Sequence, residues 1–312
     1  MNPEDLLEEC TLCPRMCHVN RKQGKKGYCG QSGELKAARA ALHMWEEPCI
    51  SGSEGSGTIF FSGCPLKCMY CQNHNIAVGS AGKGISVSRL SEIFLNLQAQ
   101  GANNINLVTP THFVPYLLQA IPKAKQQGLQ IPIVYNTSGY ERVETLKLLE
   151  GLVDIYLPDF KYMDEKLARE YSNAPDYSEY AKQAIAEMAR QVKSCQFDRK
   201  TGLIKRGMIV RHLVLPGHTE DSKRVIQFLY KTYGEKIYLS LMNQYTPMPA
   251  VKNHPLLSRR LTKREYNKVV DYALELGIKN GFVQEGKTAS KSFIPEFDEE
   301  GINERNTLPG CN

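Results

Sequence analysis

Residues 57–71, GTIFFSGCPLKCMYC, join an apolar run directly to three closely spaced cysteines. The run at 57–62 is rich in β-branched and aromatic residues, which predicts a buried strand. Cys64, Cys68 and Cys71 follow it in the pattern C-x3-C-x2-C. In α/β proteins the loops at the carboxyl ends of parallel strands carry the chemistry, so this loop is the first candidate site.

The rest of the chain alternates between strand-like and helical patterns. Further strands are predicted at 105–109, 131–135, 153–158, 208–215 and 236–241. Helices are predicted at 88–100 (with Ser88 as the cap), 111–128, 140–150, 177–194, 219–233 and 262–276. This alternation indicates an α/β fold, and we expect a partial TIM-like (β/α)6 barrel. A doubly wound parallel sheet is the alternative.

The length and composition are those of an ordinary globular protein. We expect a Cys-rich metal-binding segment at 1–50, a barrel at 51–285 and a polar tail at 286–312. The net charge of +6 is weak and scattered, which argues against a nucleic-acid partner. The start of the chain is acidic, unlike a signal peptide, and no run approaches the roughly 18 apolar residues of a membrane span. We therefore expect a cytoplasmic protein with no membrane partner.

The cysteines are concentrated at the front of the chain, where eight of the ten lie within the first 71 residues. In a reducing compartment such clusters indicate metal ligands. A structural zinc site closes with four ligands, whereas a [4Fe–4S] cluster held by three cysteines leaves one iron open to another ligand. For the loop at 64–71 the alternative is a zinc site completed by His74.

The segment SGCPLKCMYCQN (62–73) resembles the cluster loop of the radical S-adenosylmethionine (SAM) superfamily, including the aromatic residue before the last cysteine. The likeness extends from about residue 57 to 245 and is greater for the glycyl-radical-enzyme activases. A group of activase-like proteins also shares CTLCPRMC (10–17) and EEPCISGSEGSGTIFFSGC (46–64). The resemblance implies a [4Fe–4S] cluster on the three cysteines, with SAM chelating the fourth iron.

The resemblance also implies residues that contact SAM. Tyr70 would stack on the adenine, and Asn73 matches an asparagine beside SAM. YNTSG (135–139) and LPDFK (157–161) match the family's third and fourth strand ends. Lys161 is suited to the methionyl carboxylate. The full implied set is Tyr70, Asn73, Thr109, Asn136, Thr137, Asp159, Lys161, Leu213 and Gln244.

Three positions depart from the family pattern. The glycine-rich turn after the second strand, which receives the SAM amino group, reads Thr109-Pro110-Thr111 here, and the proline lacks a backbone donor. Asn136 replaces an aspartate. The usual sixth-strand histidine is missing, and Asn243 and Gln244 lie nearby instead. These departures affect the choice of substrate more than the SAM chemistry.

A second cysteine group, Cys10, Cys13, Cys17 and Cys29, has the spacing C-x2-C-x3-C-x11-C. Four ligands close a metal site, so this module is expected to hold a second [4Fe–4S] cluster or a structural zinc ion.

These features predict a radical SAM enzyme that forms a 5′-deoxyadenosyl radical and installs a glycyl radical on a partner enzyme. The expected partners are a flavodoxin- or ferredoxin-like electron donor and a protein or peptide substrate. The alternatives are radical modification of a peptide or small molecule, and a redox-sensing iron–sulfur protein without turnover.

Overall fold

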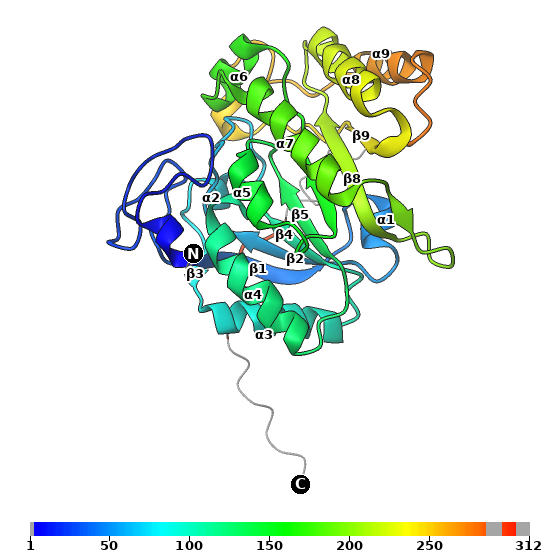
Figure 1. The fold of residues 1–312 in the computed structure, drawn as a ribbon. Helices are drawn as coiled ribbons and strands as arrows, with labels where there is room; N and C mark the ends of the chain where they lie inside the picture. Colours follow the sequence, from blue (N-terminus) through cyan, green and yellow to red (C-terminus); the bar gives the residue numbers. More distant parts are fainter. Residues whose placement is uncertain (1–2, 285–294, 304–312) are drawn as a thin grey trace.

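The computed structural model describes residues 3–284 and 295–303. Its centre is one sheet of ten strands in the order β10-β9-β8-β6-β5-β4-β2-β1-β3, with β7 paired to β8 (Figure 1). The strands are β1 (Lys36–His43), β2 (Ser56–Phe61), β3 (Lys83–Gly84), β4 (Ile105–Val108), β5 (Ile133–Thr137), β6 (Ile155–Pro158), β7 (Gln196–Phe197), β8 (Ile204–Leu213), β9 (Tyr238–Met242) and β10 (Gly281–Val283).

Seven of these strands, from β2 to β10 without β3 and β7, run parallel, and each pairs with the next in chain order. A doubly wound sheet reverses its strand order partway, and this order does not reverse. The sheet does not close, because β10 and β3 end the order without pairing to each other. The prediction of a partial TIM-like barrel is therefore confirmed. Each of the six predicted strands is present, with bounds shifted by a few residues.

Helices cover the outer face of the sheet (Figure 1). The α-helices are α1 (Pro48–Ser51), α2 (His74–Ala77), α3 (Val87–Ala99), α4 (Val114–Gln126), α5 (Val143–Leu148), α6 (Glu165–Ser172), α7 (Tyr177–Val192), α8 (Thr219–Tyr233) and α9 (Lys263–Glu275). Short 3-10 helices occur at η1 (Pro3–Leu7), η2 (Thr111–Phe113), η3 (Gly234–Lys236) and η4 (Pro249–Val251).

The helix termini follow local capping chemistry. Thr262 caps α9 in a reciprocal box with Glu265. The predicted cap of α3 was wrong: the hydroxyl of Ser86, not Ser88, accepts a hydrogen bond from the backbone of Arg89. Both serines precede an apolar repeat, so the sequence pattern alone did not separate them.

The central strands are buried on both faces, since every residue of β2, β5 and β6 is buried. Parallel strands covered by helices on one side and by core side chains on the other have this pattern. The apolar core extends between the strands and α3, α4 and α7. Among the described residues, no helix combines the length and apolarity that crossing a bilayer requires.

Strand β1, KAARAALH, was not predicted. Alanine favours helix over strand in isolation, and here antiparallel pairing with β2 decides the conformation. Through β1, part of segment 1–50 joins the barrel sheet. The proposed boundary at residue 50 stays a prediction.

Candidate active site

A cavity of about 710 Å³ lies at the carboxyl ends of the parallel strands. One residue from each of six successive strand ends lines it: Cys64, Thr109, Thr137, Asp159, Leu213 and Gln244. The other residues predicted for SAM and the cluster line it as well: Cys68, Tyr70, Cys71, Asn73, Asn136 and Lys161. The structure therefore brings together in one cavity the whole set that the motifs indicated.

The loop that carries the three cysteines has a positive φ at two positions, one just before it and one within it. Gly63 has a φ of +86°, and a Cβ there would lie 2.7 Å from the carbonyl oxygen of Cys29, so only glycine fits. Lys67 also has a positive φ, of 50°. These turns curl the backbone so that the three sulfurs face the same cavity.

Hydrogen bonds hold two of the sulfurs. The Leu66 amide lies 3.4 Å from Cys64 Sγ, and the Ser172 hydroxyl donates to Cys68 Sγ at 3.1 Å. Burial and the neighbouring thiols raise the pKa of Cys71 to about 12, so the thiol keeps its proton until a metal replaces it. Hydrogen bonds to sulfur and burial are the features that tune iron–sulfur clusters.

Tyr70 is buried among aromatic side chains. Its hydroxyl lies 2.6 Å from that of Tyr162, which in turn lies 2.9 Å from Ser172 Oγ. The rings of Tyr171 and Tyr245 meet Tyr70 edge-on. These contacts orient the ring at the cavity wall before any ligand arrives, as a stacking residue requires.

A charged network forms the cavity floor. Lys161 Nζ lies 2.7 Å from Asp159 Oδ2, and the Arg211 guanidinium contacts Asp159 at 3.0 Å and Asn136 at 2.6 Å. Burial opposes ionisation of Asp159, but the charges of Lys161 and Arg211 outweigh it and lower the pKa of the carboxyl. Asp159 is therefore ionised, and Lys161 keeps donors available for an anionic group.

Two members of this network were not singled out from the sequence. Arg211 begins the segment RHLVLPGHTED (211–221), but its interior position on β8 had no local signal. Glu46 comes from the connection before β2, and its carboxylate contacts Arg211 at 3.1 Å and Asn106 at 3.0 Å. The one sequence feature that could have drawn attention to Glu46 is the acidic pair that precedes Pro48.

Thr111 serves a different purpose from that expected. Its hydroxyl donates to Glu141 at 2.5 Å, and the Thr137 hydroxyl bonds the same carboxyl oxygen. Burial raises the pKa of Glu141 to about 7, against the lowering effect of these hydrogen bonds. Thr109 lines the cavity, whereas Thr111 supports it from beneath through Glu141.

Among the described residues, His43 is the one histidine that lines the cavity. His74, the alternative fourth ligand, is exposed at the start of α2 and is not among the lining residues. His112 is buried with Nε2 2.7 Å from the Ser62 carbonyl oxygen, and burial lowers its pKa to about 3. The neutral His112 ring therefore serves the packing beneath the cluster loop.

The four cysteines of the N-terminal module lie near enough to one another to influence the pKa of Cys13 and Cys29. Cys10, Cys13 and Cys29 are buried, and the Tyr28 amide donates to Cys17 Sγ at 3.2 Å. Burial, and the nearby thiols of Cys10 and Cys17, raise the pKa of the Cys29 thiol, although Arg21 opposes this. Among the described residues, no three His, Cys, Asp or Glu side chains converge as around a single ion. Cysteines around a cubane bind separate irons and do not converge on one point.

The module packs directly on the cluster loop. The Arg15 guanidinium donates to the carbonyls of Pro65 at 2.8 Å, Ser172 at 2.9 Å and Asn173 at 2.5 Å. It also lies 3.9 Å from the centre of the Tyr28 ring. Arg15, which lies between two cysteines of the module, thus contacts the loop that carries Cys64, Cys68 and Cys71.

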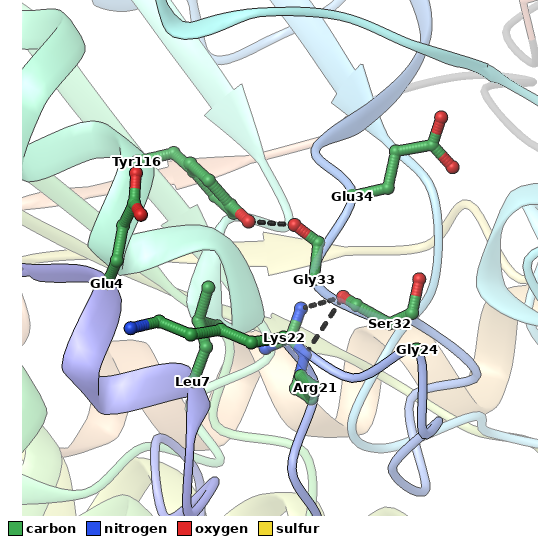
Figure 2. Close-up of a pocket in the computed structure, with 9 residues that line it drawn as sticks. All are labelled: Glu4, Leu7, Arg21, Lys22, Gly24, Ser32, Gly33, Glu34 and Tyr116. Carbon is green, nitrogen blue, oxygen red and sulfur yellow. Dashed lines mark hydrogen bonds between the residues drawn. The ribbon is translucent and has the colours of Figure 1, made fainter.

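A second cavity, of about 440 Å³, lies where the module meets α4 (Figure 2). The Tyr116 hydroxyl donates to the Gly33 carbonyl, and Arg21 donates twice to the Ser32 carbonyl. None of the predicted site residues lines it: its walls are Glu4, Leu7, Arg21, Lys22, Gly24, Ser32, Gly33, Glu34 and Tyr116. It is a packing cavity beside the module and not the candidate active site.

The fold and the three-cysteine cavity define an enzyme class in which an open barrel holds an iron–sulfur cluster beside a nucleotide. The family model for the radical SAM superfamily matches residues 58–229, more than half of the chain. The chain belongs to the radical SAM superfamily. It is therefore an enzyme that uses a [4Fe–4S] cluster and SAM and that cleaves SAM by a radical mechanism.

Relatives give a range of functions. An uncharacterized protein of Methanocaldococcus jannaschii is 30% identical over 281 residues, which cover 86% of this chain and 75% of that one. The FeFe-hydrogenase maturase HydG of Carboxydothermus hydrogenoformans is 14% identical with a TM-score of 0.50, over 76% of this chain and 59% of HydG. SuiB of Streptococcus suis, bound to its precursor peptide, is 13% identical with a TM-score of 0.48, over 72% of this chain. The chain spans about half of the length of SuiB, 47%.

Proposed function

We propose that this enzyme takes a hydrogen atom from a carbon of a protein or peptide and installs a glycyl radical on a partner enzyme. The observation that carries the SAM-binding part is that twelve motif residues, from six strand ends, line one cavity. Cys64, Cys68 and Cys71 would hold a [4Fe–4S] cluster, which would supply the electron for the reductive cleavage of SAM. The glycyl radical rests on the resemblance of the strand-end motifs to those of the activases.

Each side chain has a proposed task. Tyr70 stacks on the adenine, held by its bond to Tyr162. Asn136 and Thr137 bind the ribose and the carboxylate, and Lys161 adds a cation for the carboxylate. Asp159 orients Lys161 through their 2.7 Å contact. Asn73, Thr109, Leu213 and Gln244 complete the walls and exclude water from the radical.

The rim of the cavity favours a macromolecular substrate. Met44 and Trp45 on one side, and Val283 at the other edge of the open sheet, line the cavity and are exposed to 44%, 56% and 46%. Exposed apolar side chains at the mouth of a site suit an inserted peptide segment. A flavodoxin- or ferredoxin-like protein is the proposed electron donor, because cleavage of SAM needs a cluster of low potential.

We also propose a metal centre in the N-terminal module, either a second [4Fe–4S] cluster or zinc. Arg21 is fully buried and donates to the Ser32 and His112 carbonyls, and none of these partners is a carboxylate. Its guanidinium lies 3.9 Å from Cys10 Sγ. A buried cation needs a nearby negative charge, and four thiolates around a metal carry a net negative charge that supplies it.

The test is anaerobic incubation of reconstituted, dithionite-reduced protein with SAM, followed by chromatography. We expect 5′-deoxyadenosine and methionine in equal amounts. If neither forms, a redox-sensing iron–sulfur protein without turnover replaces the proposal.

The glycyl radical is tested by adding glycyl radical enzymes from the same organism and recording electron paramagnetic resonance spectra. A radical signal that requires SAM supports the activase role. Cleavage of SAM without any such signal supports modification of a peptide or a small molecule instead.

A further inference from the structure

The segment between β1 and β2 carries two adjacent glutamates into the barrel. The Glu46 amide donates to Ser51 Oγ at 3.1 Å, and the Ile50 amide donates to the Glu47 carbonyl at 2.7 Å. These bonds form a tight turn at the start of α1. Glu46 and Glu47 both line the large cavity.

The charges along this cavity do not balance. Among the described lining residues, Arg211 and Lys161 are the cations, and Glu46, Glu47 and Asp159 are the carboxylates. Arg211 pairs with Glu46 and Asp159, and Lys161 pairs with Asp159. His43, the remaining wall residue that could carry a positive charge, is neutral because burial and Arg39 lower its pKa to about 4. Glu47 is therefore left without a cation in contact.

Glu47 is also incompletely hydrogen-bonded. Its exposed fraction is 8%, and its Oε2 atom has no hydrogen-bond partner among the described residues. Burial raises the pKa of this carboxyl, and the charge of Arg211 and the Ser240 side chain on β9 oppose the rise without cancelling it. The three Arg211 donor groups are taken by Asp159, Glu46 and Asn136. A buried carboxyl oxygen without a donor is unfavourable unless a ligand supplies one.

We propose that Glu47 binds a positively charged nitrogen group of the substrate, an ammonium or a guanidinium, inside this cavity. This inference rests on the proposed function and specifies its substrate: a protein would present a lysine or arginine near the carbon that loses its hydrogen. Such a group supplies both the missing charge and the missing donor. A neutral hydroxyl would supply only the donor.

The only tryptophan of the chain, Trp45, lies two residues from Glu47 on the cavity wall and reports on binding there. The probes are n-butylammonium, n-butylguanidinium, 1-butanol and butanoate, titrated into reconstituted protein without reductant. Binding is measured by calorimetry and by Trp45 emission. We expect saturable binding of the two cations, and Glu47→Gln should weaken it by about tenfold or more.

The matched control is Glu54→Gln, which removes an exposed charge from the same connection and should leave cation affinity unchanged. Glu47→Asp, which keeps the charge, should retain part of the affinity. Circular dichroism checks that each variant is folded. If 1-butanol binds as tightly as the cations, or if Glu47→Gln binds them as the wild type does, the inference is wrong.

Competition separates this site from the SAM site. SAM should leave the cation affinity unchanged within about twofold; strict competition would assign Glu47 to SAM and overturn the inference. The titrations involve no turnover. Failure of the wild type to cleave SAM would therefore count against the proposed function alone, and failure to bind cations against this inference alone.

Discussion

The two cysteine groups of this protein use the same ligand in different surroundings. The loop at 64–71 extends from the buried strand β2 and faces a large cavity among six strand ends. The module at 10–29 lies beside the short helix η1, which packs on α4 (Figure 1). Three of its four cysteines, Cys10, Cys13 and Cys29, are buried. In the proposed function, three ligands beside a cavity leave room for a substrate, whereas four ligands around a metal leave none. The first group would then be a site for chemistry, and the second a site for structure or electron relay.

The largest expected effect separates the two groups by activity. Cys68→Ala removes one of the three ligands beside the cavity, so 5′-deoxyadenosine formation should fall to the level of a control without enzyme. Cys195→Ala is the matched control, because Cys195 lies apart from both groups and contacts the Met208 carbonyl. Chromatography of the products measures both. Full activity of Cys68→Ala would contradict the assignment of the loop.

The second-largest expected effect distinguishes the two cysteine groups by their contribution to stability. Cys13→Ala removes one ligand of the proposed four-cysteine metal centre. We expect the free energy of unfolding to fall by about 5 kcal/mol, because metal binding at such sites is coupled to folding. Chemical denaturation measures this value. Cys68→Ala should lower the free energy of unfolding by less. Equal losses in the two variants would contradict a separate structural role for the module.

Metal analysis identifies the module's centre. About eight irons per chain indicate a second cluster, and about four irons with one zinc indicate a structural ion.

A third prediction concerns the carboxyl between the two regions. Glu141 bonds Thr137 at the cavity, and the adjacent Arg142 donates to the Thr11 carbonyl of the module at 2.7 Å. The pKa of Glu141 rises from 4.5 to about 7 because of burial. The folded state therefore keeps a proton that the unfolded state releases, and stability is lost as the pH rises through this window.

Glu141→Gln should remove this loss. A rise in the pKa of Glu141 from 4.5 to about 7 corresponds to a loss of about 3 kcal/mol in the free energy of unfolding. This loss is complete above pH 7 and absent below pH 4.5. Denaturation of both proteins at pH 4.5 and pH 8 measures the difference. If the variant and the wild type differ in stability by the same amount at pH 4.5 and at pH 8, the pKa of Glu141 is not raised.

The smallest effect concerns the contact between the regions. Arg15→Ala removes three charge-assisted hydrogen bonds to carbonyls, including that of Pro65, and should lower the free energy of unfolding by about 2 kcal/mol. Arg169→Ala, on the exposed face of α6, is the control and should change it by less than about 0.5 kcal/mol. If the two variants lose the same stability, the contact of Arg15 with the cluster loop does not stabilise the fold.

Much of the fold and site was predictable because their signals are local. The six strands show apolar runs, and the cysteine spacing lies within eight residues. The strand-end motifs each occupy a few positions, and parallel strands bring their carboxyl ends to one edge. The cap of α3 was wrong because Ser86 and Ser88 both satisfy the local pattern, and only the backbone selects one.

From the sequence alone, periodicity predicted the barrel, and the resemblance of the cysteine loop and strand-end motifs to a known family predicted the superfamily and twelve of the residues that line the cavity. Only the tertiary structure decided that alanine-rich β1 is a strand, that Arg211 bridges Asp159 and Glu46, and that Glu47 faces the cavity without a cation. These features arise from contacts between residues far apart in the chain. Long-range packing sets which charges meet, and no local pattern encodes that result.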